Sequence, residues 1–394
     1  MDRRDVLKAL AAAPFATTAG RLFAAPVAQT KLLLVFLRGG YDAANLLVPV
    51  SSSFYYTSRP NIAIPRPSTE LNSALPLDAD WGLHPALRDT VYPLYQQGQV
   101  TFIPFAGTDD VSRSHFETQD SIEMGQALQG NRNFSSGFLG RLSTTLQGAR
   151  PMSWTDQLPL VFQGGVHIPN MALKSLGKPS VDARQGAIIT AMYRETPLAI
   201  PVSEGFGVRE EVIREMSSEM DAASRSAITA KGFELEARRI GRLMRDKFNL
   251  GFVDIGGWDT HVGEGGAAGY LAGRLEELGR GLAAFADELG SGWRDTVVVV
   301  ISEFGRTFRE NGNRGTDHGH GTVYWVLGGG IRGGRIAGRQ VRVEQATLFQ
   351  NRDYQVLNEY RAVLAGLLGR MYGLSDSQIE GVFPGVHGLD IGVL

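Results

Sequence analysis

Continuous apolar runs separated by a helix-like segment constrain the fold of this chain most strongly. Residues 31–37 (Lys-Leu-Leu-Leu-Val-Phe-Leu) and 296–301 (Thr-Val-Val-Val-Val-Ile) are almost wholly apolar, which is typical of strands buried on both faces of a sheet. Apolar residues at three- and four-residue steps predict an amphipathic helix over 271–289. We expect further strands at 99–105, 253–255 and 323–327. This alternation predicts an α/β fold, a doubly wound, mostly parallel sheet with helices on both faces.

The length and composition are compatible with one large domain. The chain has 394 residues, of which 43% are hydrophobic, so it can bury a sizeable core. We expect one α/β domain over residues 29–394. Within it, residues 130–205 mix Gly, Pro and Ser with short apolar pieces that follow no clear period, which favours an insertion or cap. Residues 51–80 predict a long surface excursion for the same reason.

The first residues have the pattern of an export signal. Arg3-Arg4 precedes an apolar, alanine-rich stretch at 9–20 and the small residues of 23–26. This pattern predicts a twin-arginine signal over residues 1–28, export by the twin-arginine machinery, and a mature protein in the periplasm or outside the cell. An ordinary amphipathic N-terminal helix is the alternative. No apolar segment reaches the length of a transmembrane helix.

Composition excludes several classes of site. The chain has no cysteine, which rules out disulfides, thiolate metal sites, iron–sulfur clusters and a cysteine nucleophile. The net charge is −2, and no run of Lys or Arg outside the N-terminus could follow a phosphate backbone, so we do not expect nucleic acid as a partner. Any bound metal must therefore be held by Asp, Glu and His.

Candidate metal ligands follow the predicted strands. Loops at the carboxyl ends of parallel strands converge on one crevice, so residues far apart in sequence can meet there. Three glycine-rich segments, 256–261, 301–307 and 315–321, contain three of the seven histidines. Glycine lets the backbone come close to an ion, and carboxylate and imidazole groups bind divalent cations. We expect one or two ions of Zn, Mn, Mg or Ca per chain, with ligands drawn from Asp42, Asp259, His261, Glu303, Asp317, His318 and His320.

Each candidate ligand also has an ordinary structural interpretation, and for some of them it is nearly as strong. These interpretations are a turn aspartate at position 42, an Asp259–His261 hydrogen bond, a Glu303–Arg306 ion pair and a solvated polar turn at 317–320. The shared placement of these side chains beyond strand ends favours the metal site.

Ser114 is the candidate nucleophile, because at a helix start its hydroxyl lies among free backbone N–H groups that stabilise an anion. Ser114 and Glu117 also match a capping box, and the local pattern by itself favours that cap. Arg306 offers a fork for the oxygens of a phosphate or sulfate during catalysis. Arg38 and His115 are candidates for binding the substrate, and His115 is also a possible ligand.

Several motifs together resemble those of the bacterial domain of unknown function 1501 family. The resemblance covers nearly all of the chain after the export signal, and the twin-arginine leader also fits. The motifs are Phe-Leu-Arg-Gly-Gly-Tyr-Asp at 36–42, Trp-Gly-Leu-His-Pro at 81–85, Ser-His-Phe-Glu at 114–117, Gly-Gly-Trp-Asp-Thr-His at 256–261, Ser-Glu-Phe-Gly-Arg-Thr at 302–307 and Thr-Asp-His-Gly-His-Gly at 316–321.

That family in turn resembles the alkaline phosphatase and sulfatase superfamily, which implies an alkaline-phosphatase-like sheet, two metal ions and a nucleophile at a helix start. By position, the resemblance implies that Ser114 is the nucleophile. It implies that the metal ligands are Asp42, Asp259, His261, Glu303, and either His318 or His320. Two features depart from the superfamily pattern. Glu303-Phe304 stands where Asp-His is usual, and no Cys-x-Pro-x-Arg segment is present, which disfavours a conventional sulfatase.

These inferences predict an exported metal-dependent hydrolase of phosphate or sulfate esters. Its partner would be an anionic ester, for which a polysaccharide is one candidate carrier. The alternative is a non-catalytic secreted protein of the same fold, a binding factor associated with the cell surface or with polysaccharide.

Overall fold

The computed structural model describes residues 29–164, 167–173, 181, 183–216 and 232–394. The predicted export signal at 1–28 lies outside these residues. The main sheet has eight strands in the order β10-β5-β9-β8-β1-β7-β6, with β11 also paired to β5. The strands are β1 (Lys31–Leu37), β5 (Val100–Gly107), β6 (Pro151–Ser153), β7 (Leu250–Ile255), β8 (Thr296–Ser302), β9 (Thr322–Leu327), β10 (Arg335–Ile336) and β11 (Asn358–Glu359).

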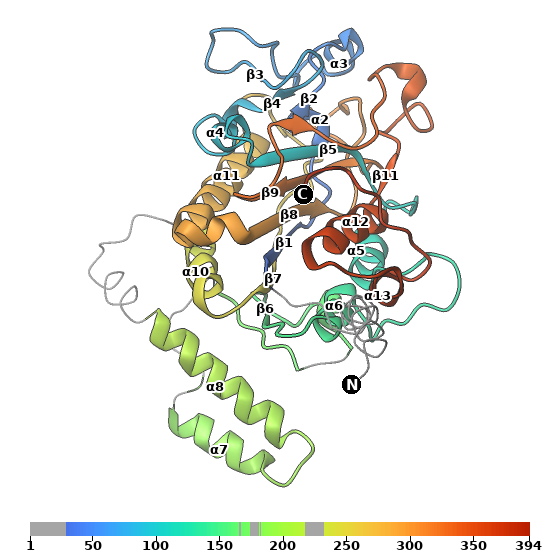
Figure 1. Ribbon diagram of the computed structural model, residues 1–394. Helices are drawn as coiled ribbons and strands as arrows, with labels where there is room; N and C mark the ends of the chain where they lie inside the picture. The colour runs from blue at the N-terminus through green and yellow to red at the C-terminus, as the bar shows by residue number, and fades with distance from the viewer. Residues whose placement is uncertain (1–28, 165–166, 174–180, 182, 217–231) are drawn as a thin grey trace, which may run out of the picture.

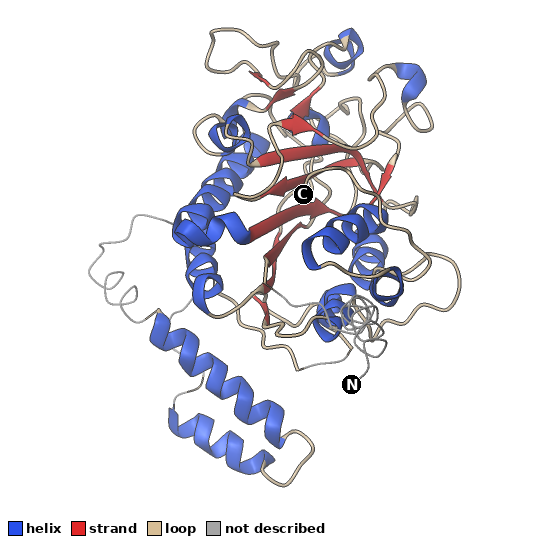
Figure 2. Cartoon of the chain, viewed as in Figure 1, coloured by secondary structure: helices blue, strands red, loops and turns tan. Residues whose placement is uncertain are grey.

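Helices cover both faces of this sheet (Figure 2), so the predicted fold class is confirmed. The side chains of β1 explain its continuous apolar run. Leu32, Leu34 and Phe36 belong to a core with α6 (Phe138–Thr145), α12 (Tyr360–Tyr372) and α13 (Asp376–Val382). The alternate residues of β1 face the opposite core, which contains α10 (Gly232–Asp246) and α11 (Tyr270–Leu289). Because successive side chains point to opposite faces, a strand between two cores needs apolar residues at every position.

β9 is the exception to the parallel arrangement, since it runs antiparallel to both β8 and β5. Residues 303–321 connect β8 to β9 without a helix and turn back at the edge where β8 ends. A parallel pair would need a crossover connection, so this direct return makes β9 antiparallel. The return places residues 315–321 beside the carboxyl ends of β1, β7 and β8.

The predicted insertion divides into two parts. Residues 138–153 form α6 and the edge strand β6, which pairs in parallel with β7 and belongs to the main sheet. Helices α7 (Ala183–Tyr193) and α8 (Ala199–Glu215) form a hairpin that projects from the body (Figure 1). Residues 194–198, which join these helices, are all exposed.

The predicted excursion at 51–80 packs on the body of the protein. It contains α3 (Ser53–Ser58) and β3 (Leu75–Pro76), which forms a small antiparallel sheet with β2 (Leu47–Val48) and β4 (Gly82–Leu83). The remaining helices that precede the site are α2 (Ala43–Leu46), α4 (Val91–Gln96) and α5 (His115–Met124). Within the described residues, no helix combines the length and the apolar character that crossing a bilayer requires.

His84 is fully buried and is fixed by two backbone contacts. Its Nδ1 accepts from the N–H of Ala86 at 3.0 Å, and its Nε2 lies 3.1 Å from the carbonyl oxygen of Gly266, to which it donates in this tautomer. Burial lowers the pKa of His84 to about 4. The unfolded chain therefore binds a proton at this site that the folded protein does not, between the ordinary histidine pKa near 6.5 and about 4.

Stability is accordingly expected to fall as pH decreases through this window, by up to about 3 kcal/mol from His84, since one pKa unit corresponds to about 1.4 kcal/mol. A His84→Gln variant should lose that part of the pH dependence, which urea unfolding across the window measures. His387→Ala, which removes an exposed histidine, should keep it. Identical pH profiles of wild type and His84→Gln would contradict the assignment.

Candidate metal centre

Four segments meet at one edge of the sheet. In the parallel register Leu37 of β1 lies beside Ile255 of β7 and Ser302 of β8, so the loops after these strands start at the same level. β5 runs in the same direction, and α5 begins eight residues after it ends. The return segment before β9 closes the group. The loops thus bring together His115, Asp259, His261 and His318, as the rule for parallel strand ends predicts.

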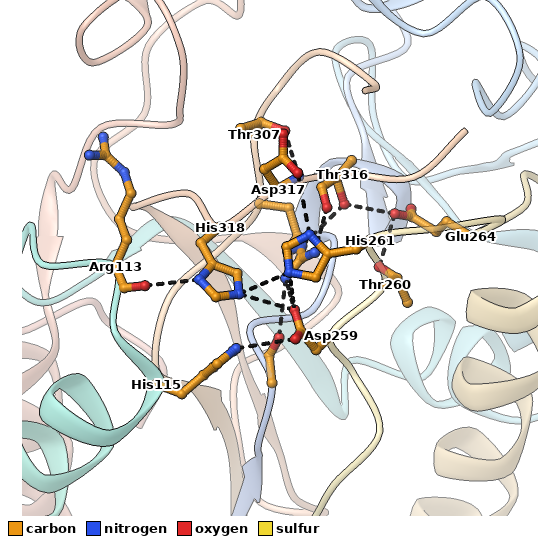
Figure 3. Close-up of polar contacts among 12 residues, drawn as sticks. Arg113, His115, Asp259, Thr260, His261, Glu264, Thr307, Thr316, Asp317 and His318 are labelled. Atoms are coloured by element: carbon orange, nitrogen blue, oxygen red, sulfur yellow. Dashed lines mark hydrogen bonds and ion pairs between the residues drawn. The ribbon is translucent and has the colours of Figure 1, made fainter. Parts of the chain in front are cut away.

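Three imidazole rings point their Nε2 atoms at one carboxylate (Figure 3). The distances to the Asp259 carboxylate oxygens are 3.0 Å from His261, 3.2 Å from His318 and 3.4 Å from His115. The Nε2 atoms of His261 and His318 lie 3.1 Å apart. His115, Asp259 and His318 each offer one possible metal-ligating atom, and these three atoms lie within 4.8 Å of one another.

The other nitrogen of each ring is held by an oxygen. Nδ1 of His115 lies 2.8 Å from Oε1 of Glu303, Nδ1 of His318 lies 2.9 Å from the carbonyl oxygen of Arg113, and Nδ1 of His261 lies 3.3 Å from Oδ1 of Asp317. The Arg113 carbonyl can only accept and the Glu303 carboxylate accepts when ionised, so the shorter contacts of His318 and His115 favour a hydrogen on Nδ1. With the hydrogen on Nδ1, Nε2 keeps the lone pair that a metal-binding histidine needs.

These residues fit a divalent cation. Two nitrogen ligands of a tetrahedral ion, each at about 2.0–2.1 Å, would lie about 3.3 Å apart, close to the separation of the two Nε2 atoms. The Nε2 of His115 is buried and has no hydrogen-bond partner among the described residues. A buried nitrogen without a partner is costly, so its direction toward Asp259 favours a ligand role. The set of three imidazoles and one carboxylate suits Zn or Mn better than Ca or Mg.

Glu303 orients His115 in this structure. Its Oε1 also accepts from the N–H of Gly39 at 2.7 Å and from Gln119 at 2.8 Å, and its Oε2 accepts from Ser302 at 2.9 Å. Burial would raise the pKa of Glu303, but the contacts with His115 and Gln119 lower it below its ordinary value. The same contact raises the pKa of His115. These contacts favour a role in which Glu303 orients His115 over the predicted role as a direct metal ligand.

Arg306 holds Asp259 in place. Its buried guanidinium donates to Asp259 and to the hydroxyl and carbonyl oxygens of Thr316. Burial would raise the pKa of Asp259, but Arg306 lowers it, so the carboxylate stays ionised. The side chain of Arg306 is fully buried, and its donors already bind Asp259 and Thr316. The structure therefore favours a role in holding Asp259 over the predicted contact with substrate oxygens.

Asp42 lies outside the cluster. It forms a buried ion pair in which both of its oxygens meet the guanidinium of Arg59, and it accepts from the N–H of Ala44 at the start of α2. Arg59 lies in the segment predicted as a surface excursion, and its side chain is fully buried. Burial would raise the pKa of Asp42, but Arg59 lowers it. The predicted metal ligand is thus a structural carboxylate in this arrangement.

Three further predicted residues have other partners. The guanidinium of Arg38 contacts Asp254, Gln119 and Glu123 at 2.6–2.8 Å, which favours a structural link over substrate binding. His320 is buried against the ring of Phe349, with centroids 4.9 Å apart, and is not in the cluster. Asp317 is half exposed, accepts from Asn311 at 3.1 Å and contacts Nδ1 of His261, which favours orientation of His261 over the predicted metal binding.

Ser114 directly precedes His115 at the start of α5, and its side chain does not cap the helix. It is the N-cap residue of α5, but its side chain makes no capping hydrogen bond, so the capping-box alternative is wrong. No hydrogen bond of its hydroxyl occurs within the part of the chain that the structure describes. It lies between Arg113, whose carbonyl holds His318, and His115, which contacts Asp259.

Two residues of the site were missed in the sequence. Gln119 stands one helical turn after His115 on α5, and that four-residue spacing could have indicated a shared contact with Glu303. Phe304 packs against the rings of His115 and His318, with centroids 4.9 and 5.1 Å away. Its position directly after Glu303 offered no signal for this, because the contact depends on how the loop turns.

Comparison with known proteins gives a family and weak structural similarities. No curated protein matches the chain. A structure of a protein in the alkaline phosphatase superfamily from Vibrio parahaemolyticus is 12% identical, with a TM-score of 0.41, over 88% of this chain and 68% of that one. Ps i-CgsB in complex with k-i-k-neocarrahexaose is 9% identical, with a TM-score of 0.39, over 92% of this chain and 75% of that one. The family model described as protein of unknown function (DUF1501) matches residues 29–383, and the chain therefore belongs to that family.

Proposed function

We propose that the protein is a metal-dependent hydrolase of phosphate or sulfate esters. The observation that supports it most is the convergence of three imidazole Nε2 atoms on the Asp259 carboxylate, one of them from His115, which directly follows Ser114. His115, Asp259, His261 and His318 would hold the cation. When bound, a divalent cation supplies Lewis-acid polarisation of the ester oxygens and stabilises negative charge.

The residues around Ser114 suit nucleophilic attack on an anionic ester. The hydroxyl would form a bond to phosphorus or sulfur while the bond to the alcohol oxygen breaks, and the proton of Ser114 would leave with that alcohol. Water would then hydrolyse the serine ester, regenerate the hydroxyl and release phosphate or sulfate. Backbone N–H groups in the first turn of α5, which follows Ser114, would stabilise the negative charge of the anion.

The contacts favour one cation per chain. A second ion would need further carboxylates or imidazoles, but Asp42 is paired with Arg59, and Glu303 is engaged with four donors. Phe304 adds an apolar ring beside His115 and His318. Asp259 and His261 each have 41% of the side chain exposed, so the centre is open to a substrate from solvent. A sulfated or phosphorylated polysaccharide is one candidate for that substrate.

The experiment is an assay of the purified protein with aryl phosphate and aryl sulfate esters in the presence of Zn, Mn, Mg or Ca. We expect turnover with at least one cation, about one ion per chain by elemental analysis, and a loss of turnover of about 10²-fold or more in Ser114→Ala. Exposed Ser377→Ala is the matched control.

Export is tested separately. If the protein is exported, active protein recovered from the periplasm or the medium lacks residues 1–28. Recovery of active protein in the cytoplasm with that segment intact would contradict export.

The other outcomes separate the alternatives. Turnover that survives Ser114→Ala would indicate direct attack by water. A bound cation without turnover on any ester would favour the non-catalytic secreted binding protein. Absence of both would contradict the proposal.

A further inference from the structure

Glu264 is a fully buried carboxyl group to one side of the proposed cation site, next to Thr316 and Thr260 (Figure 3). It lies in the segment between β7 and α11. Its Oε2 accepts from the hydroxyl of Thr260 at 2.9 Å and from the hydroxyl of Thr316 at 2.8 Å. One oxygen atom therefore joins two loops that are more than fifty residues apart in sequence.

Both threonines are close to metal-binding side chains. Thr260 stands between Asp259 and His261, and Thr316 lies two residues before His318. The hydroxyl of Thr316 also accepts from Arg306 at 3.1 Å, and Arg306 in turn donates to Asp259. The contacts of Glu264 thus reach both loops that contribute to the centre, directly and through Arg306.

The second oxygen of Glu264 indicates a neutral acid. Oε1 is buried and has no conventional donor among the described residues, and the group interacts with the carboxyl of Asp42. Burial and the negative charge of Asp42 raise the pKa of Glu264 well above its ordinary value, while Arg59 keeps that of Asp42 low. The proton of the pair accordingly belongs to Glu264, which can donate it to Asp42 and still accept from both threonines.

We propose that Glu264 is a positioning residue for the cation site, which fixes the loops at 256–264 and 315–321 to each other through the two threonine hydroxyls. By doing so it sets the separation of Asp259 and His261 from His318. The inference rests on the cation-binding part of the proposed function and is independent of whether the protein hydrolyses esters.

The test is the affinity for Zn²⁺, measured by calorimetry on wild type, Glu264→Ala and Glu264→Gln. We expect Glu264→Ala to bind about 10–100-fold more weakly, which is the usual effect of removing a group that supports metal ligands. Glutamine keeps an oxygen for the threonines and offers an N–H to Asp42, so Glu264→Gln is expected to bind nearly as tightly as wild type. Glutamine also preserves the packing around Glu264, so a variant that removes only a hydrogen bond is needed to separate that bond from packing, and Thr316→Val is such a variant.

Thr316→Val keeps Glu264 and removes one of its two donors, so it decides the matter if Glu264→Ala fails to fold. We expect weaker Zn²⁺ binding in Thr316→Val, whereas Thr144→Val, at an exposed position of α6, should bind as wild type does. Unchanged affinity in Glu264→Ala or Thr316→Val, or equally weak binding by Glu264→Gln and Glu264→Ala, would overturn the inference while leaving the cation site intact. A wild-type protein that binds no Zn²⁺ would overturn both.

Discussion

Replacing His318 with alanine is expected to lower the affinity for Zn²⁺ or Mn²⁺ by more than about 100-fold. Removing a residue that only orients a metal ligand already costs about 10–100-fold, and His318 is proposed to bind the ion directly. Its Nε2 lies 3.1 Å from that of His261 and 3.2 Å from Asp259, so it contacts two other candidate ligands of the centre. Turnover should fall with the affinity. Calorimetric titration and elemental analysis measure the loss.

Two other histidines serve as controls for this prediction. His387 is exposed on the surface, so His387→Ala should bind the cation as wild type does. His320 belongs to the same motif as His318, but its ring packs against Phe349. His320→Ala should therefore keep the cation affinity of the folded protein. Tight binding by His318→Ala, or loss of binding in His320→Ala alone, would show that the wrong histidine had been assigned.

Replacing Arg59 with alanine is expected to reduce the free energy of unfolding by about 3–5 kcal/mol, the usual cost of removing one partner of a buried ion pair. The side chain of Arg59 is fully buried against Asp42. It also donates to the carbonyl oxygens of Phe308 at 2.7 Å and Thr307 at 3.1 Å, which would lose their partners. The variant leaves the buried Asp42 carboxylate without its cationic partner and the two carbonyl oxygens without the guanidinium donor. Denaturant unfolding in the absence of cations gives the magnitude.

Arg66→Ala is the matched control, since Arg66 lies seven residues away and is exposed. It should change the free energy of unfolding by less than about 1 kcal/mol. Excess cation should not restore the stability of Arg59→Ala specifically, because Asp42 is not expected to bind the ion. A stability close to that of Arg66→Ala would contradict the structural role of this pair.

The sheet was predictable because burial on two faces leaves a plain signal. The strands β1 and β8 follow from apolar residues at every position, and α11 follows from its three- and four-residue spacing. The antiparallel direction of β9 was not predicted. It depends on a connection that turns back at one edge without a helix, and the polar, glycine-rich residues of 303–321 are compatible with either course.

The candidate site was predictable in its location and less so in its division of roles. Of the seven predicted ligands beyond strand ends, Asp259, His261 and His318 lie in contact with one another in the structure. Whether a carboxylate binds a metal or an arginine depends on long-range partners, and the one that engages Asp42 is Arg59, inside a polar segment without periodicity. Glu264 gave no motif at all, since its role arises only when Thr260 and Thr316 come together.

The projecting hairpin of α7 and α8 offers a convenient handle for spectroscopy. Its connecting residues 194–198 are exposed, and the chain contains no cysteine. A Glu195→Cys substitution would consequently introduce a unique thiol, and a maleimide dye would attach there and nowhere else. The tumbling of such a fluorophore would report how stiffly the two helices are joined to the rest of the molecule.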